Sequence, residues 1–426
     1  MLLLKNCKIV NYDKIEEGNI YIKDNIIFDI SKTLEDYKNI ENSEIIDCSG
    51  KIVIPALIDM HSHFRDPGYE YKEDIESGSR AALAGGYFAS VLMANTKPAC
   101  DSEEIITYIV EKAKRTNLID IYPAGCITIN REGQQIVEMG EMIKAGAVCF
   151  SDDGACVMNS EVARRALEYA KSFDSFILSH AEDINLSEGG QINEGDISTI
   201  TGLKGIPSEA EEIMIAREIL LTKLTKSHTH ICHVSTEKAV ELIKWAKDRN
   251  INVTCEVTPH HLTFTDEKLM NYETTYKMNP PLRKEKDIET LIQGIKEGIV
   301  DVIATDHAPH HIDEKYIEFE QAAFGITGLQ TTIPLILSLI KRNLLDIKDL
   351  VRLTSYNPAK ILNLKKVGKV EKNYLANITI IDPHRKYIFD EKINKSKSIN
   401  SPLFGQELEG LAVYTIRNGN ICYAIS

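Results

Sequence analysis

The sequence lacks the features of a secreted or disulfide-bonded protein. None of its nine cysteines forms a CxxC pair, and an odd number without regular spacing does not make a disulfide framework. Scattered cysteines of this kind are typical of reduced, mostly buried thiols in a cytoplasmic protein. The N-terminus, MLLLKNCKIV, has a run of only three leucines before Lys5, which is too short for a secretory signal.

Long hydrophobic runs and an excess of positive charge are also missing. The stretch TIPLILSLI (332–340) is too short to cross a bilayer and is followed by Lys341 and Arg342. The chain carries 49 Lys and Arg against 63 Asp and Glu, a formal net charge of −14. This charge disfavours a nucleic acid or an anionic membrane as the main partner, so a small anionic ligand would need a local arginine.

The two ends of the 426-residue chain resemble each other in composition and differ from the middle. Residues 1–54 and 370–426 contain short β-branched runs separated by Asn, Asp and Gly, as strands do. Near the C-terminus, Arg417-Asn418-Gly419-Asn420 predicts a hairpin turn. We expect one small β-sandwich domain assembled from both termini.

The middle of the chain, residues 55–369, alternates candidate strands with amphipathic segments. Three of these segments predict helices that open with a serine as N-cap: 102–115, 160–173 and 208–223. Eight strand–helix units over roughly 300 residues predict an α/β protein with a (β/α)8 TIM barrel, which needs about 250. The longest connections, 183–207 and 259–285, are expected to be excursions on the loop face.

Polar residues that can bind metals follow most of the candidate strands. In a barrel, the carboxyl ends of the strands form the mouth where catalytic groups lie. His61 and His63 are two positions apart in the first strand and therefore point to the same side. The other candidates, at the ends of the fourth, fifth, sixth and eighth strands, are Asp152 or Asp153, His180, His233 and Asp306.

Each candidate also has a structural interpretation. An isolated HxH is more often a hydrogen-bonded buried pair, a lone buried His180 is more often structural, and DDG is commonly a turn. His228 and His230 are expected in the wall, and His260 and His261 could line the pocket. The joint occurrence at five strand ends favours a metal site. Four histidines and two carboxylates suit a pair of divalent ions, most simply Zn²⁺.

Two motifs resemble the signatures of the dihydroorotase family, in the amidohydrolase superfamily. They are DMHSHFRDPG (59–68) and ATDHAPHHIDEK (304–315), in which Lys315 completes the second signature, and the resemblance covers essentially the full chain. It is strongest to the bacterial type I branch, in which an aspartate replaces the carboxylated lysine that bridges the metals elsewhere. GAVCFSDDG (146–154) fits that branch, because Lys144 lies before the strand.

The resemblance implies two Zn²⁺ ions per chain. It makes His61, His63 and Asp306 ligands of the first ion and His180 and His233 ligands of the second. Asp153 bridges both, because the family's bridging residue directly precedes the glycine. Ser62 and Ala56 depart from the residues usual in the family, at positions where we expect effects on packing only.

The resemblance also implies the substrate, dihydroorotate or its open form N-carbamoyl-L-aspartate. Guanidinium binds carboxylate through two parallel hydrogen bonds, which suits Arg65. The alternative for Arg65 is a surface salt bridge with Asp66 or Glu70. Asp306 is the expected catalytic base and then acid, and residues 310–323 are an expected lid. The remaining implied substrate contacts are His63, Phe64, Asn95, Asn279, His310, Phe324 and Gly325.

Two other functions remain open from the sequence. Allantoinase and dihydropyrimidinase share the barrel and the HxH pair, but they usually bridge their metals through a carboxylated lysine and need no arginine clamp. A non-catalytic subunit that scaffolds aspartate carbamoyltransferase would lack several of the ligands present here. The resemblance further implies a cytoplasmic homodimer and leaves association with aspartate carbamoyltransferase open.

Overall fold

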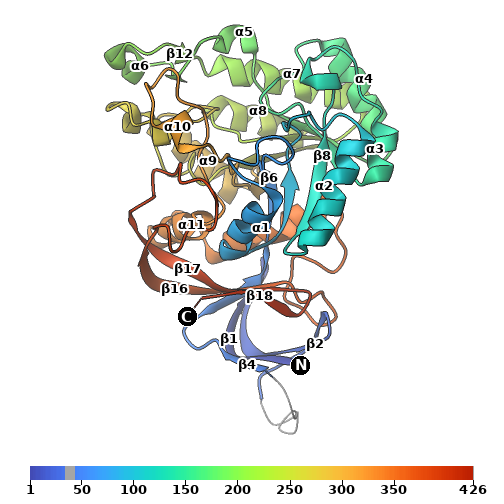
Figure 1. The fold of residues 1–426 in the computed structure, drawn as a ribbon, viewed down its shortest axis with the longest axis vertical. Helices are drawn as coiled ribbons and strands as arrows, with labels where there is room; N and C mark the ends of the chain where they lie inside the picture. Colours follow the sequence, from blue (N-terminus) through green and yellow to red (C-terminus); the bar gives the residue numbers. More distant parts are fainter. Residues whose placement is uncertain (34–43, 426) are drawn as a thin grey trace.

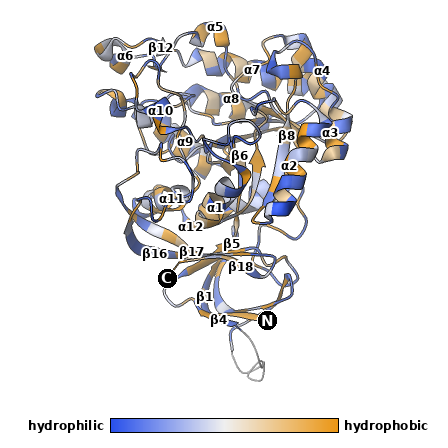
Figure 2. Cartoon of the chain, viewed as in Figure 1, coloured by the Kyte–Doolittle hydropathy of each residue, from blue (hydrophilic) through white to orange (hydrophobic). Residues whose placement is uncertain are grey.

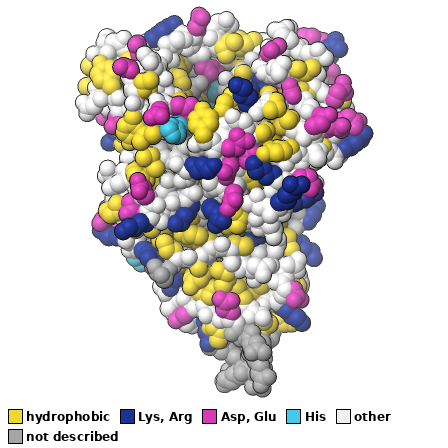
Figure 3. Space-filling view, viewed as in Figure 1, with side chains coloured by type: hydrophobic (Ala, Val, Ile, Leu, Met, Phe, Trp, Pro, Cys, Tyr) yellow, Lys and Arg dark blue, Asp and Glu magenta, His cyan; other side chains and the backbone are white. Residues whose placement is uncertain are grey.

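The computed structural model describes residues 1–33 and 44–425. Figure 1 shows a large upper body of strands and helices above a smaller sheet that holds both chain ends. None of the described helices is both long and apolar enough to pass through a membrane. Acidic and basic side chains are interspersed over the face seen in Figure 3.

The upper body is a parallel eight-stranded barrel. Its strands are neighbours in chain order, and a parallel bridge between Ser62 and His307 joins the last to the first. The His63 amide also donates to the His307 carbonyl at 2.9 Å, so the barrel is closed. The strands are β6 (Leu57–Ser62), β7 (Tyr87–Leu92), β8 (Asp120–Gly125), β9 (Cys149–Phe150), β10 (Ile177–Ser179), β13 (Thr229–Ile231), β14 (Val253–Val257) and β15 (Val302–Ile303).

A helix follows each barrel strand along the chain. In α2, the buried residues Ile106, Ile109 and Ala113 are spaced three and four apart, so one face packs inward while the other carries charge. In Figure 2, β6 is orange, whereas α2 carries both blue and orange residues. The helices are α1 (Ile75–Ala84), α2 (Glu103–Thr116), α3 (Met139–Ala145), α4 (Ser160–Lys171), α7 (Glu209–Thr225), α8 (Glu237–Lys247), α9 (Glu285–Lys296) and α11 (Thr332–Lys341).

Two of the three predicted serine N-caps are confirmed in position, and the third is wrong. The α4 helix is capped by Asn159, whose side chain accepts from the amides of Glu161 and Val162, and Ser160 is the first helical residue. Ser102 and Ser208 do occupy the N-cap positions of α2 and α7, but neither side chain makes a capping hydrogen bond. Asn159 is the N-cap of α4 because its longer side chain reaches two backbone amides from the position directly before the helix.

The two long connections form a layer over the mouth of the barrel. The first contains α5 (Ile184–Ser187), β11 (Ile192–Asn193), α6 (Asp196–Thr201) and β12 (Gly205–Ile206), and the second contains 3₁₀ turns at Asp266–Leu269 and Thr274–Tyr276. They share an apolar cluster that includes Ile192, Leu269 and Phe319. The excursions therefore pack on each other and on the segment that contains α10 (Ile312–Lys315).

The smaller sheet is built from both termini, as predicted. Its order is β18-β17-β16-β5-β1-β2-β3, with β4 paired to β1, and side chains from strands of both ends share one apolar core. Arg417 pairs with Asn420 across Asn418 and Gly419, both at positive φ, which confirms the predicted hairpin turn. The strands are β1 (Leu2–Val10), β2 (Ile15–Lys23), β3 (Ile26–Ser31), β4 (Glu44–Asp47), β5 (Ile52–Pro55), β16 (Ile378–Ile388), β17 (Glu407–Arg417) and β18 (Asn420–Ala424).

Candidate metal centre

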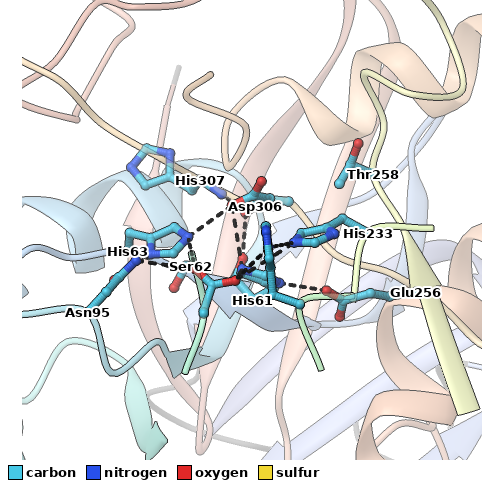
Figure 4. Close-up of polar contacts among 12 residues, drawn as sticks. His61, Ser62, His63, Asn95, His233, Glu256, Thr258, Asp306 and His307 are labelled. Atoms are coloured by element: carbon cyan, nitrogen blue, oxygen red, sulfur yellow. Dashed lines mark hydrogen bonds and ion pairs between the residues drawn. The ribbon is translucent and has the colours of Figure 1, made fainter. Parts of the chain in front are cut away.

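Six side chains from five strand ends meet at one point in the barrel mouth, and Figure 4 shows His61, His63, His233 and Asp306 among them. Asp153 is at the centre. Its Oδ1 lies 3.4 Å from His61 Nε2, 3.5 Å from His180 Nδ1 and 3.8 Å from His233 Nε2, and its Oδ2 lies 3.6 Å from His63 Nε2. We call these residues the His/Asp cluster: His61, His63, Asp153, His180, His233 and Asp306.

Asp306 faces the cluster from the opposite side of the barrel mouth. Its Oδ1 lies 3.0 Å from His63 Nε2 and 3.5 Å from His61 Nε2. Both Asp306 and His233 have positive φ, of 42° and 34°. Such backbone conformations are costly for residues other than glycine and are found most often where function requires them.

The donor atoms of the cluster fit divalent cations. His61, His63 and Asp306 form one group of mutually close donor atoms, and His61, Asp153 and His233 form another. His61 Nε2 and Asp153 Oδ1 are buried without a hydrogen-bond partner. A buried polar atom without a partner is costly, and a cation shared by these atoms would remove that cost.

His180 lies in the cluster but belongs to neither of these two groups. Its Nδ1 contacts His233 Nε2 at 2.9 Å, and its Nε2 contacts Glu182 Oε2 at 2.8 Å. A third group of close donors combines His61 with Cys232 and Glu256, on the side of His61 away from the two aspartates.

The cluster carries buried negative charge. Burial alone raises the pKa of Asp153 and of Asp306, but the neighbouring imidazoles, His61 first, outweigh burial and hold both pKa values well below their usual range. Burial lowers the pKa of His61. The carboxylates of Asp306, Asp153 and Glu256 outweigh burial and raise this pKa well above the usual value. Both aspartates are therefore held as carboxylates, the form that binds cations.

A second layer of polar residues orients the histidines. His61 Nδ1 lies 2.7 Å from Glu256 Oε1, whose other oxygen is 3.1 Å from His230 Nε2. His63 Nδ1 lies 2.9 Å from Asn95 Oδ1, and Asn95 also donates to Asp153 Oδ2 at 3.2 Å. Metal-binding histidines usually have such a partner at the second ring nitrogen, which fixes the free one.

The sequence analysis missed Glu256 and Glu182. Glu256 is the only charged residue of β14, and a charged side chain in a buried barrel strand is a usable signal. Glu182 accepts from Asn279 Nδ2 at 2.9 Å as well as contacting His180. Asn279, expected at the substrate, thus lies beside the cluster.

Arg65 lies next to the cluster with φ of 59°. Its Nε donates to the Pro309 carbonyl at 3.2 Å, and its Nη2 lies 3.3 Å from His310 Nε2. Among the ion pairs of residues 1–33 and 44–425, none joins Arg65 to a carboxylate, and Asp66 instead pairs with Lys112 at 2.6 Å. The arginine is therefore free to bind an anion beside His310.

The remaining predicted substrate contacts are placed by the packing of the mouth. Phe64 is buried, with its ring against the backbone of Gly78 in α1. The Phe324 carbonyl accepts from His310 Nε2 at 2.8 Å, and the Gly325 amide donates to the Lys277 carbonyl at 3.0 Å. Phe324 and Gly325 therefore lie beside His310 through hydrogen bonds within the chain.

Comparisons with known proteins agree with this geometry. The Dihydro-orotase-like family matches residues 50–239. The chain is 46% identical to a dihydroorotase of Acetivibrio thermocellus over 423 residues, covering 99% of this chain and 98% of the relative. It is also 46% identical to a dihydroorotase of Caldicellulosiruptor saccharolyticus over 424 residues, with the same two coverages.

Solved structures agree in fold. L-hydantoinase (dihydropyrimidinase) from Arthrobacter aurescens superimposes with a TM-score of 0.88 at 25% identity, covering 99% of this chain and 96% of that one. The barrel, the His/Asp cluster and the terminal sheet define an enzyme of the amidohydrolase type that acts on cyclic amides. Within this class, the full-length identity shows that the chain belongs to the dihydroorotase family.

Proposed function

We propose that this chain catalyses the reversible hydrolysis of the ring amide of (S)-dihydroorotate to N-carbamoyl-L-aspartate, a step of pyrimidine biosynthesis. The observation that carries this proposal is the position of Arg65 and His310 beside the His/Asp cluster in a member of the dihydroorotase family. A clamp for a carboxylate next to a hydrolytic site suits a cyclic amide that carries a ring carboxylate.

The proposed cofactor is Zn²⁺, two ions per chain. His61, His63 and Asp306 would hold one, His180 and His233 the other, and Asp153 both. When bound, such ions lower the pKa of water and polarise a carbonyl oxygen. The unpartnered His61 Nε2 and Asp153 Oδ1 support this assignment.

The residues of the chain have separate roles in the reaction. Arg65, Asn95 and His310 bind the ring carboxylate, and His63, Phe64, Asn279, Phe324 and Gly325 complete the pocket. Asp306, held by His63, takes the proton of the attacking water and delivers it to the ring nitrogen as the carbon–nitrogen bond breaks. Ring closure uses the same steps in reverse.

A coupled assay tests the proposal. Purified chain is given dihydroorotate in one direction and N-carbamoyl-L-aspartate in the other, each with and without a chelator, and with hydantoin and allantoin as comparison substrates. We expect turnover in both directions, its loss with chelator and recovery with Zn²⁺. Preference for hydantoin or allantoin, or turnover that survives complete metal removal, would reject the proposal.

The location, assembly and domain division of the chain are also proposals. We propose a cytoplasmic homodimer that can associate with aspartate carbamoyltransferase, with domain boundaries at 54/55 and 369/370 and a lid at 310–323. The nine cysteines are all free, which supports a reducing compartment. Sedimentation with and without the carbamoyltransferase tests the assembly.

A further inference from the structure

The C-terminal part of the chain reaches into the barrel mouth through Asn400. This side chain is buried, with 2% of its surface exposed. Its Oδ1 accepts from the His310 amide at 3.0 Å, and its Nδ2 donates to the carbonyls of Ala308 at 2.9 Å and Gly325 at 3.1 Å. The side-chain amide of Asn400 thus joins the segment 308–310 to Gly325. Both lie beside the side chain of His310, which contacts Arg65.

Lys315 donates to the same backbone. Its side chain is fully buried, and Nζ donates to the carbonyls of Ala323 at 2.7 Å, Gly325 at 3.1 Å and Lys277 at 3.2 Å. Among the described residues, no carboxylate pairs with it in any ion pair, and burial lowers its pKa to about 7. Burying an amine is costly, and the three carbonyl oxygens offset that cost only in this backbone arrangement.

The two side chains meet at one atom, the carbonyl oxygen of Gly325. This glycine has φ of 146°, and a Cβ there would lie 2.7 Å from the Ala308 carbonyl oxygen. The segments 308–310 and 323–325 are therefore in close contact and need donors at their inward carbonyls. The lysine and the asparagine supply these donors from two chain segments that are far apart in the sequence.

We propose that Lys315 and Asn400 are positioning residues that together lock the segment 323–325 against 308–310. The lock sets the distance between His310 and Phe324–Gly325, and so shapes the part of the pocket that grips the ring carboxylate. The statement about substrate rests on the proposed function. Asp306 is placed by other bonds, because the Thr305 amide donates to Asp59 at 2.9 Å. The lock therefore controls substrate binding more than the chemical step.

Four substitutions test the lock. Lys315→Met removes the ammonium, and Asn400→Leu removes all three bonds. Lys315→Arg keeps the charge, and Asn400→Asp keeps the acceptor while losing the donors. We expect KM for dihydroorotate to rise at least about tenfold in Lys315→Met, Asn400→Leu and Asn400→Asp, with kcat within about threefold of the parent. Lys315→Arg should recover part of the loss in KM.

Asn11→Leu is the matched control. Asn11 is equally buried and accepts from the Val370 amide at 2.8 Å while donating to the Val370 carbonyl at 3.0 Å, directly after β1 of the terminal sheet. It should lose stability like Asn400→Leu while KM stays unchanged. A rise of KM in the control as large as in the lock variants would show a general effect of destabilisation and overturn the proposal.

Amide hydrogen exchange without substrate separates this inference from the proposed function. We expect residues 308–326 to exchange at least about tenfold faster in Lys315→Met and Asn400→Asp, and at the parent rate in Asn11→Leu. If the parent chain does not turn over dihydroorotate, the proposed function fails while exchange still tests the lock. Unchanged exchange in folded Lys315→Met and Asn400→Asp, or a fall in kcat with unchanged KM, would overturn the lock.

Discussion

A single buried carboxylate determines which nitrogen of His61 faces the cluster. Glu256 Oε1 lies 2.7 Å from Nδ1, on the side of the ring away from Asp306 (Figure 4), which leaves Nε2 directed at Asp153 and Asp306. A proton held on Nδ1 by Glu256 keeps the lone pair on Nε2 and makes the imidazole a stronger ligand. The metal affinity of the site therefore depends on a residue that is not itself a proposed ligand.

The substitution Glu256→Gln should weaken binding of divalent ions about 10- to 100-fold, because an amide is a poorer partner for the imidazole Nδ1–H. Titration of metal-stripped chain with Zn²⁺ measures the change. Asp152→Asn is the matched control, since Asp152 accepts from the amides of Ile127 and Thr128 rather than contacting the histidines. Equal affinities in Glu256→Gln and the parent would contradict the argument.

The substitution Asp306→Asn should lower kcat by about 10²- to 10⁴-fold, the range typical of removing a proton-transfer group. The amide can neither take nor deliver the proton, whereas its shape preserves the packing. Steady-state kinetics, circular dichroism and metal analysis of the same preparation measure activity, fold and metal content. Turnover near that of the parent would show that another group moves the proton.

At the level of residues, the sequence predicted the members of the cluster better than their support. His61 and His63 lie two positions apart at the end of one strand, and strand ends converge in any barrel, so the pattern could be seen without coordinates. Glu256 and Glu182 could not be assigned to particular histidines in the same way. Their partners depend on strand stagger and side-chain rotamers, which a single sequence does not reveal.

At the level of elements, α4 illustrates the limits of cap prediction. The sequence places Asn159 beside Ser160, and either residue can act as an N-cap. The position of the last strand residue, Phe150, and the course of the loop after it determine which one is outside the helix. That geometry lies in the tertiary structure, so the helix was predicted and its first residue was not.

The substitution Asn159→Ala should destabilise the chain by about 1 kcal/mol, because the amides of Glu161 and Val162 lose their acceptor. Ser160→Ala should change stability by only about 0.5 kcal/mol or less, since alanine suits the first turn of a helix. Urea unfolding of both variants, monitored by circular dichroism, measures the difference. A larger loss in Ser160→Ala would show that the serine is the true cap.

At the level of the whole molecule, the joining of the two termini in one sheet was predictable and the path of the C-terminal segment was not. Similar β-rich composition at both ends predicted a shared domain, and the pairing of β5 with β16 agrees with it. Asn400, however, contacts His310, 90 residues away, through a segment without regular structure. No periodicity marks such a contact, so the sequence could not place this segment at the barrel mouth.

Metal binding should couple the stability of the whole chain to pH. In the metal-free chain, burial lowers the pKa of His180, but Asp153 and Glu182 outweigh burial and raise it to about 10, and the pKa of His61 is also well above its usual value. At pH 8 His180 is therefore protonated without metal, and ligation must displace its proton. Adding Zn²⁺ to metal-stripped chain in weak buffer should thus acidify the solution. At a Zn²⁺ concentration of 100 times Kd, it should stabilise the fold by about 2.7 kcal/mol.

Proton release is measured with an indicator dye and stability by calorimetry. The variant Asp153→Asn is expected to show less proton release and less stabilisation. Binding without proton release would mean that His180 is neutral before the metal arrives, and the electrostatic account of the cluster would be wrong.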